Sequence, residues 1–361
     1  MATPEATTAA PNSTALPAEV STIVPDNAET KPATETPAAE APATETKPAT
    51  ETPAPTESAP PATETPVVAE KAPDVDVPVE KKTTPIEELW ALAQAHGHPE
   101  IWGVTLADPE THVPTQVILQ KYLNAYDGDL AKSKDTLTKT LDWRAKMKPV
   151  ELLKKKFNRN KFAGLGYTTV YGDADPTADP ETREVFTWNI YGSVKNLDET
   201  FGNLAEFIEW RVALMEDALQ ALGIDKATKP ITATYDPYKI LQVHDYKSIS
   251  FLRQSAVVKA ASTETIKIFA QNYPELLKEK FFVNVPAFMG FIYTFMKLFV
   301  AAKTIKKFHP MSNGANLARE MVTSSKVKGL GEMLPEEYGG KGAALNSAGR
   351  QPSLEDEPAA Q

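Results

Sequence analysis

The chain has 361 residues, with 48 acidic and 38 basic side chains and a formal net charge of −10. It contains no cysteine, which excludes disulfides, thiolate catalysis, iron–sulfur clusters and zinc sites built on cysteine. Residues 1–82 hold 14 acidic and 5 basic side chains, and the other 34 acidic and 33 basic ones nearly cancel, so net charge says little about what the rest of the chain binds.

Residues 1–83 are expected to form a disordered acidic tail rich in Pro, Ala, Thr and Glu. Residues 1–82 hold 15 of the 30 prolines, and the sequence KPATETP occurs at Lys31–Pro37 and again at Lys47–Pro53. Such a composition cannot bury enough apolar surface to offset the entropy of ordering. The N-terminus also lacks a basic stretch followed by an apolar core, so we predict no secretory signal and a cytoplasmic chain.

Residues 84–155 are expected to form a small helical domain. Thr84, Pro85 and Glu87 have the order of a cap, a first-turn proline and a first-turn acid, which predicts the start of a helix. Val117–Met147 has apolar residues at helical spacing, with a break at Asp127–Asp129.

From residue 156 the pattern changes to strands that alternate with helices. Strands are predicted at 162–171, 184–191, 240–246 and 280–285, and helices at 204–222, 249–271 and 314–326. This alternation predicts right-handed crossovers and an α/β fold with a mostly parallel sheet. We assign this second domain to residues 156–326 and expect a loose C-terminal tail at 327–361.

An apolar segment at Ala287–Ala302 is followed by the lysines Lys303, Lys306 and Lys307. Apolar residues lie on nearly every side of this expected helix, which fits a buried core helix or a mobile cover that touches a bilayer. The run from Val283 to Ala302 is the candidate for a membrane span, but proline, glycine, asparagine and lysine interrupt it. We therefore expect peripheral, reversible contact with a membrane surface.

Two stretches resemble the CRAL-TRIO lipid-binding family. Ile118–Met147 (ILQKYLNAYDGDLAKSKDTLTKTLDWRAKM) is similar to the small helical N-terminal domain of that family. Tyr273-Pro274-Glu275, then VNVP, an apolar helix and KTIKKFH, resemble the signature end of its lipid domain. The resemblance implies an α/β domain with an apolar pocket closed by a movable gate helix, here at about Ala287–Val300.

A finer resemblance, carried by Val243–Phe251 (VHDYKSISF), is to the fungal non-classical phosphatidylinositol-transfer branch, some of whose members are haem proteins. It implies a site for ferric haem b with Tyr246 as the axial iron ligand and His244 as its neighbour. The full set of haem positions that it implies is Tyr191, Arg211, His244, Tyr246 and Lys280. The segment Asp225–Tyr238 has the character of an insertion that this branch does not share.

The residues themselves are compatible with that chemistry. His244 and Tyr246 are two apart on a predicted strand, so their side chains lie on one face. A phenolate suits ferric iron, but a free tyrosine has a pKa of about 10 and needs help to ionise. Arg211 and Lys280 could pair with the haem propionates. Without the resemblance, a His-x-Tyr pair is more typical of packing, and the other residues of surface or helix-end positions.

For a lipid, the resemblance implies that Glu275 and Lys307 meet the inositol-phosphate headgroup. Glu275 would accept hydrogen bonds from inositol hydroxyls or hold a lysine in place, and Lys307 would meet a phosphate as a point charge. The simpler alternatives are a local cap for Glu275 and a solvated basic turn for Lys307.

The expected function is phosphatidylinositol transfer by a protein that also binds haem, with links to phosphoinositide homeostasis and the oxidant response. The alternatives are a dedicated haem-handling protein and a lipid-presenting scaffold. No phosphate-binding glycine loop, nucleophile elbow or nucleic-acid stripe is found, so we expect no enzyme activity and no nucleic-acid partner. The expected location is cytoplasmic, with peripheral association to endoplasmic-reticulum, microsomal or plasma membrane.

Overall fold

The computed structural model describes residues 83–247, 255–285, 300 and 302–356. Nearly all of the expected tail at 1–83, nearly all of the expected gate helix at Ala287–Val300, and the end of Val243–Phe251 lie outside the described residues. The described residues all fall within one compact unit, Val77–Gln361. Among them, no helix is both long and apolar enough to cross a membrane.

The first described segment is mainly helical, as expected. Helix α1 (Pro85–His96) begins at a capping box in which Thr84 and Glu87 satisfy each other's backbone N–H groups. Helices α2 (Val113–Ala125) and α3 (Leu130–Met147) are separated at the expected break, where Asp129 caps α3. The sequence analysis missed a short hairpin between α1 and α2, formed by β1 (Glu100–Ile101) and β2 (Val104–Thr105).

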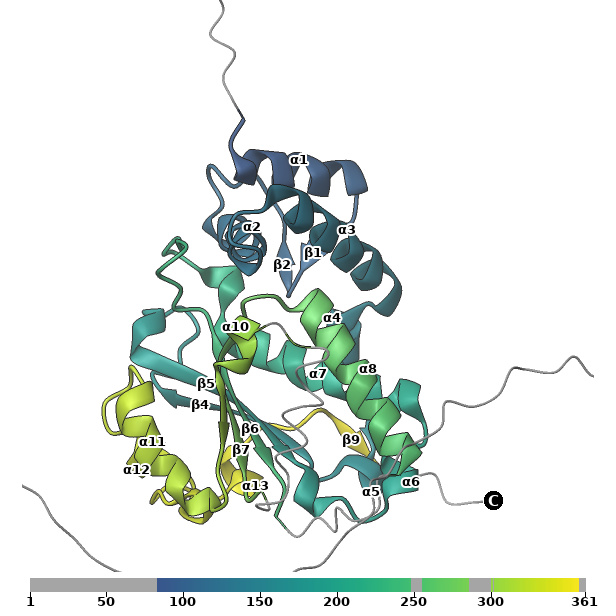
Figure 1. Ribbon diagram of the computed structural model, residues 1–361, viewed down its shortest axis with the longest axis vertical. Coiled ribbons are helices and arrows are strands. Elements are labelled where there is room, and N and C mark those ends of the chain that lie inside the picture. Colours follow the sequence, from purple (N-terminus) through teal and green to yellow (C-terminus); the bar gives the residue numbers. More distant parts are fainter. Residues whose placement is uncertain (1–82, 248–254, 286–299, 301, 357–361) are drawn as a thin grey trace, which may run out of the picture. The chain divides into compact units, whose positions relative to one another are not determined.

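A five-stranded sheet in the order β4-β5-β6-β7-β8 forms the centre of the structure (Figure 1). Its strands are β4 (Gly166–Gly172), β5 (Arg183–Ile190), β6 (Ile240–Asp245), β7 (Leu277–Val283) and β8 (Phe308–Pro310). Strands β5 to β8 pair in parallel, and β4 pairs with β5 in the antiparallel direction. The expected α/β fold with a mostly parallel sheet is therefore confirmed, although β8 was not predicted.

Helices cover both faces of the sheet (Figure 1). Helix α7 (Leu204–Leu222), whose bounds match the prediction, packs against β4 and β5, so closely that a side chain at Gly166 would collide with Trp210 and Leu214. Helix α8 (Ala256–Asn272) packs against α7. The shorter helices are α4 (Pro149–Leu152), α5 (Arg159–Phe162), α6 (Leu197–Phe201), α10 (Ala302–Ile305), α11 (Leu317–Ser324), α12 (Leu330–Met333) and α13 (Leu345–Ala348).

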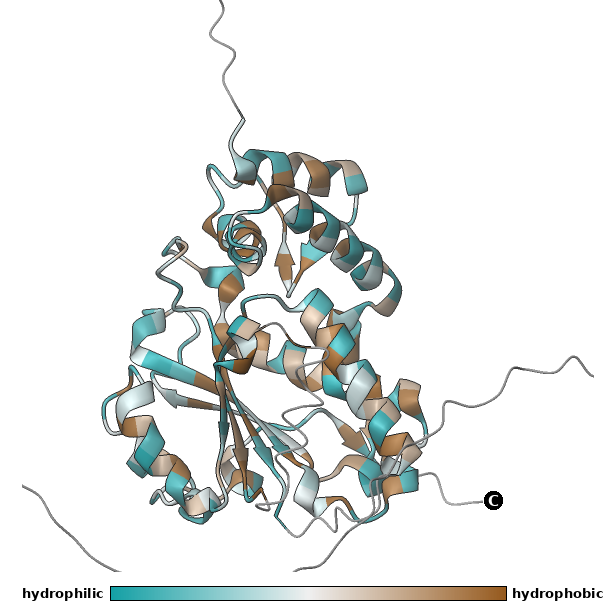
Figure 2. Cartoon of the chain, viewed as in Figure 1, coloured by the Kyte–Doolittle hydropathy of each residue, from teal (hydrophilic) through white to brown (hydrophobic). Residues whose placement is uncertain are grey.

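The two faces of the sheet differ in character. Hydrophobic residues mark the central strands in Figure 2, and on one face they form a buried cluster with the helices that follow β8. That cluster contains Phe186, Trp188, Leu241, Val243, Phe281, Leu317, Met321, Leu330 and Leu334. The face toward α7 instead carries polar side chains in its central strands, which makes it the place to search for a binding site.

The expectation of a loose tail at 327–361 is wrong for the described residues up to 356. Leu330, Leu334, Tyr338 and Leu345 are buried in the apolar cluster, and β9 (Leu354–Glu355) pairs with β3 (Phe157–Asn158). The elements in this segment have two to four residues each, too few to show a helical or strand period. Its scattered apolar residues fill the surface that the sheet leaves open.

A buried ion pair joins the helical segment to the sheet domain. Arg144 on α3 donates from Nη1 to Glu216 Oε1 on α7 at 2.8 Å and from Nη2 to Glu100 Oε1 at 2.7 Å. The hydroxyl of Tyr273 also donates to Glu216 Oε1, at 2.8 Å. The side chains of Arg144 and Glu216 are fully buried, so each depends on the other for its charge to be tolerated.

We predict that Arg144→Met lowers the free energy of unfolding by about 3–5 kcal/mol, because Glu216 is left as a buried, unpaired charge. Urea unfolding followed by tryptophan fluorescence measures this change. The control is Lys139→Met, which removes an exposed pair with Asp135 and should cost less than about 1 kcal/mol. Equal losses in the two variants would show that the buried pair does not hold the helical segment in place.

Candidate functional site

The face of the sheet toward α7 carries buried polar side chains in three neighbouring strands. The register places Asn189 beside His244, and Gln242 beside Lys280, so all four side chains share this face. Asn189 and His244 are 0% and 6% exposed. Buried polar groups are costly unless they are hydrogen-bonded, so their presence on one face calls for a specific partner.

The rings of Tyr191, His244 and Tyr246 meet on this face. The centroid of Tyr191 lies 5.5 Å from that of His244 and 5.9 Å from that of Tyr246. Phe282 on β7, which the sequence analysis did not select, stacks on Tyr246 at 6.3 Å and lies 5.6 Å from His244. The structure therefore brings the predicted His-x-Tyr pair and Tyr191 into one aromatic cluster.

Arg211 and Lys280 bring two positive charges to the same cluster. The Arg211 guanidinium lies 5.3 Å from the ring centroid of Phe269, and the Lys280 ammonium lies 5.4 Å from that of Phe282 and 5.6 Å from that of Phe308. Neither cation forms an ion pair within the described part of the chain. Aromatic faces stabilise a cation only partly, so both groups can still receive an anion.

These surroundings shift the pKa values of the cluster. Burial lowers the pKa of Lys280 from 10.5 to about 7, and the charge of Arg211 adds to this effect. Burial, with the charges of Lys280 and Arg211, holds the pKa of His244 well below its usual value, so its imidazole is neutral. Burial and the neighbouring Tyr191 raise the pKa of Tyr246, against the opposing effect of Arg211. Tyr246 therefore stays a neutral phenol unless a metal ion or similar cation approaches it.

Three buried polar atoms of this region have no hydrogen-bond partner within the described residues: Arg211 Nε, His244 Nε2 and Asn189 Oδ1. Eight other buried side-chain atoms of the described residues also lack a partner, so these three support a ligand here only together with the cations beside them. All five residues of the predicted haem set thus lie together, and two of them have a donor or acceptor without a partner in the described residues. No group of three or more histidine or acidic side chains that could hold a bare metal ion occurs among the described residues.

Asp245, between the two predicted ligands, lies on the opposite face, as strand alternation predicts. Its Oδ2 accepts a hydrogen bond from Tyr338 at 2.8 Å, and its Oδ1 accepts bonds from Asn284 Nδ2 at 2.7 Å and from the backbone N–H of Lys247 at 2.8 Å. These partners satisfy the carboxylate locally, so Asp245 belongs to the framework and not to the polar face.

A second polar region surrounds Glu275, which precedes β7. Its carboxylate oxygens lie 3.4 Å from Lys303 Nζ, 3.5 Å from Lys239 Nζ and 3.7 Å from Lys307 Nζ. Burial acts to raise the pKa of Glu275, but the three lysines outweigh it and hold that pKa below its usual value. The structure thus places Glu275 beside Lys307, as the resemblance implied, and adds Lys239 and Lys303, which no short motif connects with Glu275.

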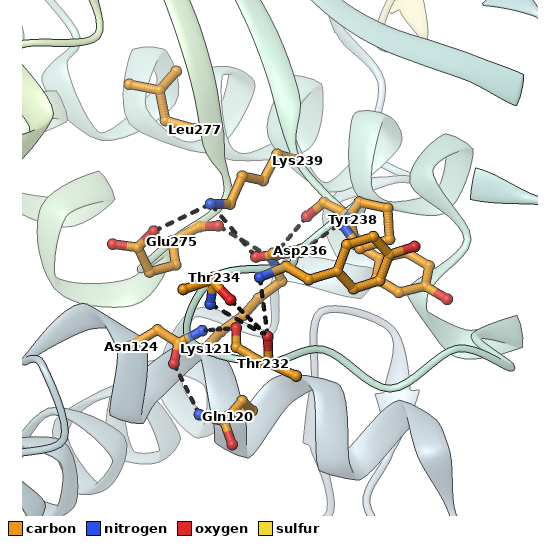
Figure 3. Close-up of polar contacts among 12 residues, drawn as sticks. Gln120, Lys121, Asn124, Thr232, Thr234, Asp236, Tyr238, Lys239, Glu275 and Leu277 are labelled. Carbon is orange, nitrogen blue, oxygen red and sulfur yellow. Dashed lines mark hydrogen bonds and ion pairs between the residues drawn. The ribbon is translucent and has the colours of Figure 1, made fainter. Parts of the chain in front are cut away.

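Lys121 of α2 supports this region from below (Figure 3). Its ammonium donates to Asp236 Oδ2 at 2.6 Å and to the backbone carbonyl oxygens of Tyr238 and Glu275 at 2.7 Å and 3.1 Å. Burial lowers the pKa of Lys121 to about 8, opposed by Asp236. We use the term lysine cluster for Lys121, Lys239, Lys303 and Lys307, which surround Asp236 and Glu275.

Asp236 was not predicted as a site residue, because it lies in the segment Asp225–Tyr238 that had the character of an insertion. The structure shows that this segment contacts α2, where Asn124 Nδ2 donates to the carbonyl of Thr232 at 2.8 Å (Figure 3).

The lysine cluster and the aromatic cluster lie toward opposite ends of β7. Lys307 of the first bonds to Leu277 and Tyr246 of the second stacks on Phe282, and these two residues of β7 are about 17 Å apart along an ordinary strand.

Comparison with known proteins supports one family. Residues 177–340 match the CRAL/TRIO domain, a range that includes part of the segment first taken for a loose tail. The chain is 72% identical over 272 residues to phosphatidylinositol transfer protein SFH5 of Chaetomium globosum, covering 75% of this chain and 62% of that relative. It is 62% identical over 271 residues to phosphatidylinositol transfer protein sfh-5 of Neurospora crassa, covering 74% of each.

A solved structure is similar as well. The crystal structure of Sfh5 superposes with a TM-score of 0.59 at 25% sequence identity, covering 75% of this chain and 94% of that one. The chain thus spans between 62% and 74% of the length of the two curated relatives named above. The names of these relatives describe lipid transfer and not catalysis, in agreement with the expectation that the chain is not an enzyme.

We predict that the stability of the ligand-free protein rises with pH above 7 because of Lys280. Between its folded pKa of about 7 and its unfolded value of 10.5, the unfolded chain binds the extra proton. The free energy of unfolding should therefore rise by up to about 1.4 kcal/mol per pH unit. Urea unfolding from pH 7 to 9 should show this rise in the wild type and a smaller one in Lys280→Met, in which Lys121, with a folded pKa of about 8, still contributes above pH 8. The exposed Lys341→Met serves as the control, and the same slope in all three proteins would contradict the burial of the Lys280 charge.

Proposed function

Since this chain belongs to the CRAL-TRIO family, in its fungal non-classical phosphatidylinositol-transfer branch, we propose that it transfers phosphatidylinositol between membranes. The observation that carries the proposal is the partly buried carboxylate of Glu275 among three lysines. A carboxylate accepts hydrogen bonds from the hydroxyl groups of a sugar-like ring, and an ammonium binds the adjoining phosphate. One site thus offers both kinds of group that an inositol-phosphate headgroup needs.

The acyl chains would be held away from water in the apolar pocket that the family resemblance implies. Removing them from water contributes about 0.8 kcal/mol per CH2, which offsets much of the cost of leaving a bilayer. Lys303 and Lys307 also attract anionic lipid, by about 1 kcal/mol per basic residue near a membrane surface. Association with endoplasmic-reticulum, microsomal or plasma membrane would then be peripheral and reversible.

We predict that Glu275→Gln with Lys307→Gln slows transfer of phosphatidylinositol between vesicles by at least about tenfold, because one charged hydrogen bond contributes about 1.5–3 kcal/mol. Fluorescent phosphatidylinositol moving from donor to acceptor vesicles measures the rate. Lys341→Gln, which removes a highly exposed lysine paired with Glu332, is the matched control and should transfer normally. Normal transfer by the double variant would refute the headgroup assignment.

We also propose that ferric haem b binds at Tyr191, Arg211, His244, Tyr246 and Lys280. The buried Arg211 and the partly buried Lys280, which have no carboxylate partners within the described residues, and orphaned atoms on Arg211 and His244, favour this second ligand. An acyl chain offers nothing to these groups, whereas two propionates and an iron ion do. Haem supplies a ferric centre that accepts a hard oxygen ligand and can change its oxidation state.

Each residue has a separate task in this proposal. Tyr246 presents its phenol oxygen, and its raised pKa means that it gives up its proton only to a strong cation. Arg211 favours the phenolate form of Tyr246 and, with Lys280, can hold a carboxylate. His244 remains neutral and can exchange a hydrogen bond with a polar group of the ligand. The alternative is a dedicated haem-handling protein without lipid transfer, and the measurements below distinguish the two.

We predict that protein purified from iron-supplemented cells shows a Soret band with ferric charge-transfer features, and that Tyr246→Phe loses at least about nine-tenths of its haem, since the iron loses its protein ligand. Visible absorption and iron content measure this loss. The partly exposed Tyr235→Phe is the control, with unchanged haem content. Colourless wild-type protein that still transfers phosphatidylinositol would rule out the haem proposal and leave lipid transfer.

A further inference from the structure

The lysine cluster carries more positive charge than its carboxylates neutralise. It has four ammonium groups against the two carboxylates of Asp236 and Glu275, a surplus of two. Asp127 also lies 3.6 Å from Lys303, but its side chain is 90% exposed, so water weakens its effect. Glu279 also acts on Lys307, but its carboxylate contacts His309 at 2.7 Å. A surplus at a partly buried place indicates that an anion belongs there.

Three of the four lysines have N–H groups that make no hydrogen bond within the described residues. Lys121 closes on Asp236 at 2.6 Å, but the other three ammonium groups stay 3.4 to 3.7 Å from Glu275, which is longer than an ordinary charge-assisted bond. Lys303 Nζ donates to the carbonyl of Asn124 at 2.9 Å and Lys307 Nζ to that of Leu277 at 2.8 Å, which uses one of the three donors of each. Lys239 makes no side-chain hydrogen bond within the described residues.

These three lysines come from separate elements and converge on one accessible place. Lys239 precedes β6, Lys303 lies on α10 and Lys307 precedes β8. Their side chains are 24%, 38% and 24% exposed, so a ligand can reach them from solvent. The short contact between Lys121 and Asp236 is buried, whereas Lys239, Lys303 and Lys307 are partly exposed and make longer contacts with Glu275.

The unused donors distinguish between headgroups better than the charge count does. A phosphatidylinositol headgroup carries one negative charge, and a further phosphate adds about 1.5 to 2 at pH 7, so the surplus of two lies between the two headgroups. The added phosphate monoester brings three acceptor oxygens, which fit several ammonium groups at once. The unused donors of Lys239, Lys303 and Lys307 therefore fit an inositol ring that bears a further phosphate.

We propose that the lysine cluster binds a phosphate monoester on an inositol ring, so that the protein takes a monophosphorylated phosphoinositide in preference to phosphatidylinositol. Lys239 and Lys303 determine this specificity, because they add charge beyond what Glu275 and Lys307 provide for the headgroup. The inference rests on the proposed headgroup site.

The test compares transfer of phosphatidylinositol and of phosphatidylinositol 4-phosphate from phosphatidylcholine vesicles. The wild type should prefer the phosphorylated lipid by about tenfold, the effect of roughly one additional charged hydrogen bond. Lys239→Gln with Lys303→Gln should abolish this preference, because transfer of the phosphorylated lipid should fall about tenfold more than transfer of phosphatidylinositol. Lys341→Gln, far from the cluster in sequence and paired with Glu332, should keep the preference.

Two results would overturn the inference: no preference in the wild type, or the same preference in the double variant. If phosphatidylinositol itself is transferred in these cases, the proposed function stands and the inference fails; if neither lipid is transferred, both fail. Calorimetry with inositol 1,4-bisphosphate separates the sources of the phosphate. Binding as tight as that of the lipid, lost in the double variant, assigns the site to a soluble inositol phosphate, and binding of the lipid alone assigns it to the membrane-borne form.

Discussion

The hydrogen bonds of the Lys121 ammonium group are the interactions on which the lysine cluster depends. Its side chain is fully buried, and such a charge is tolerated only where good acceptors surround it. It bonds to Asp236 and to the carbonyl oxygens of Tyr238 and Glu275, and so fixes the approach to β6 and to β7 from a single point on α2. Glu275 holds a left-handed backbone conformation (φ 53°) there. The helical segment is therefore part of the binding architecture, since it sets the position of the carboxylate that three lysines share.

The sheet has separate tasks on its two faces, and the alternation within β6 shows how. Leu241 and Val243 face the apolar cluster, whereas Gln242 and His244 face α7. The apolar face supplies the hydrophobic burial that stabilises the domain. On the face toward α7, Val185 and Ile240 pack into a second apolar cluster, whereas Asn189 and His244 keep atoms unpaired, which is a cost that a ligand can remove. On the opposite side of the sheet, the carboxylate of Asp245 is satisfied by local hydrogen bonds.

Local sequence patterns predicted the parts of the fold that local physics determines. The bounds of α7, the capping box of α1 and the positions of β5 and β6 follow from periodicity and from caps. The meeting of Tyr191, His244 and Tyr246 was predictable from alternation together with a family resemblance. The partnership of Glu275 with Lys239 and Lys303 was not, because these residues are far apart in the chain and meet through tertiary contacts. The short elements after residue 326 were missed because two to four residues show no period.

The pairing of β3 with β9 has a consequence for the order in which the chain folds. Arg159 and Asp356, which flank this pair, form an ion pair across 197 positions of sequence. Contacts at such separation raise the contact order, and a high contact order is associated with slow folding. During synthesis, the apolar face of the sheet stays uncovered until the segment that carries Leu330 to Leu345 has left the ribosome. The growing chain thus exposes Phe186, Trp188 and Phe281, once each has been made, until that later segment is available to cover them.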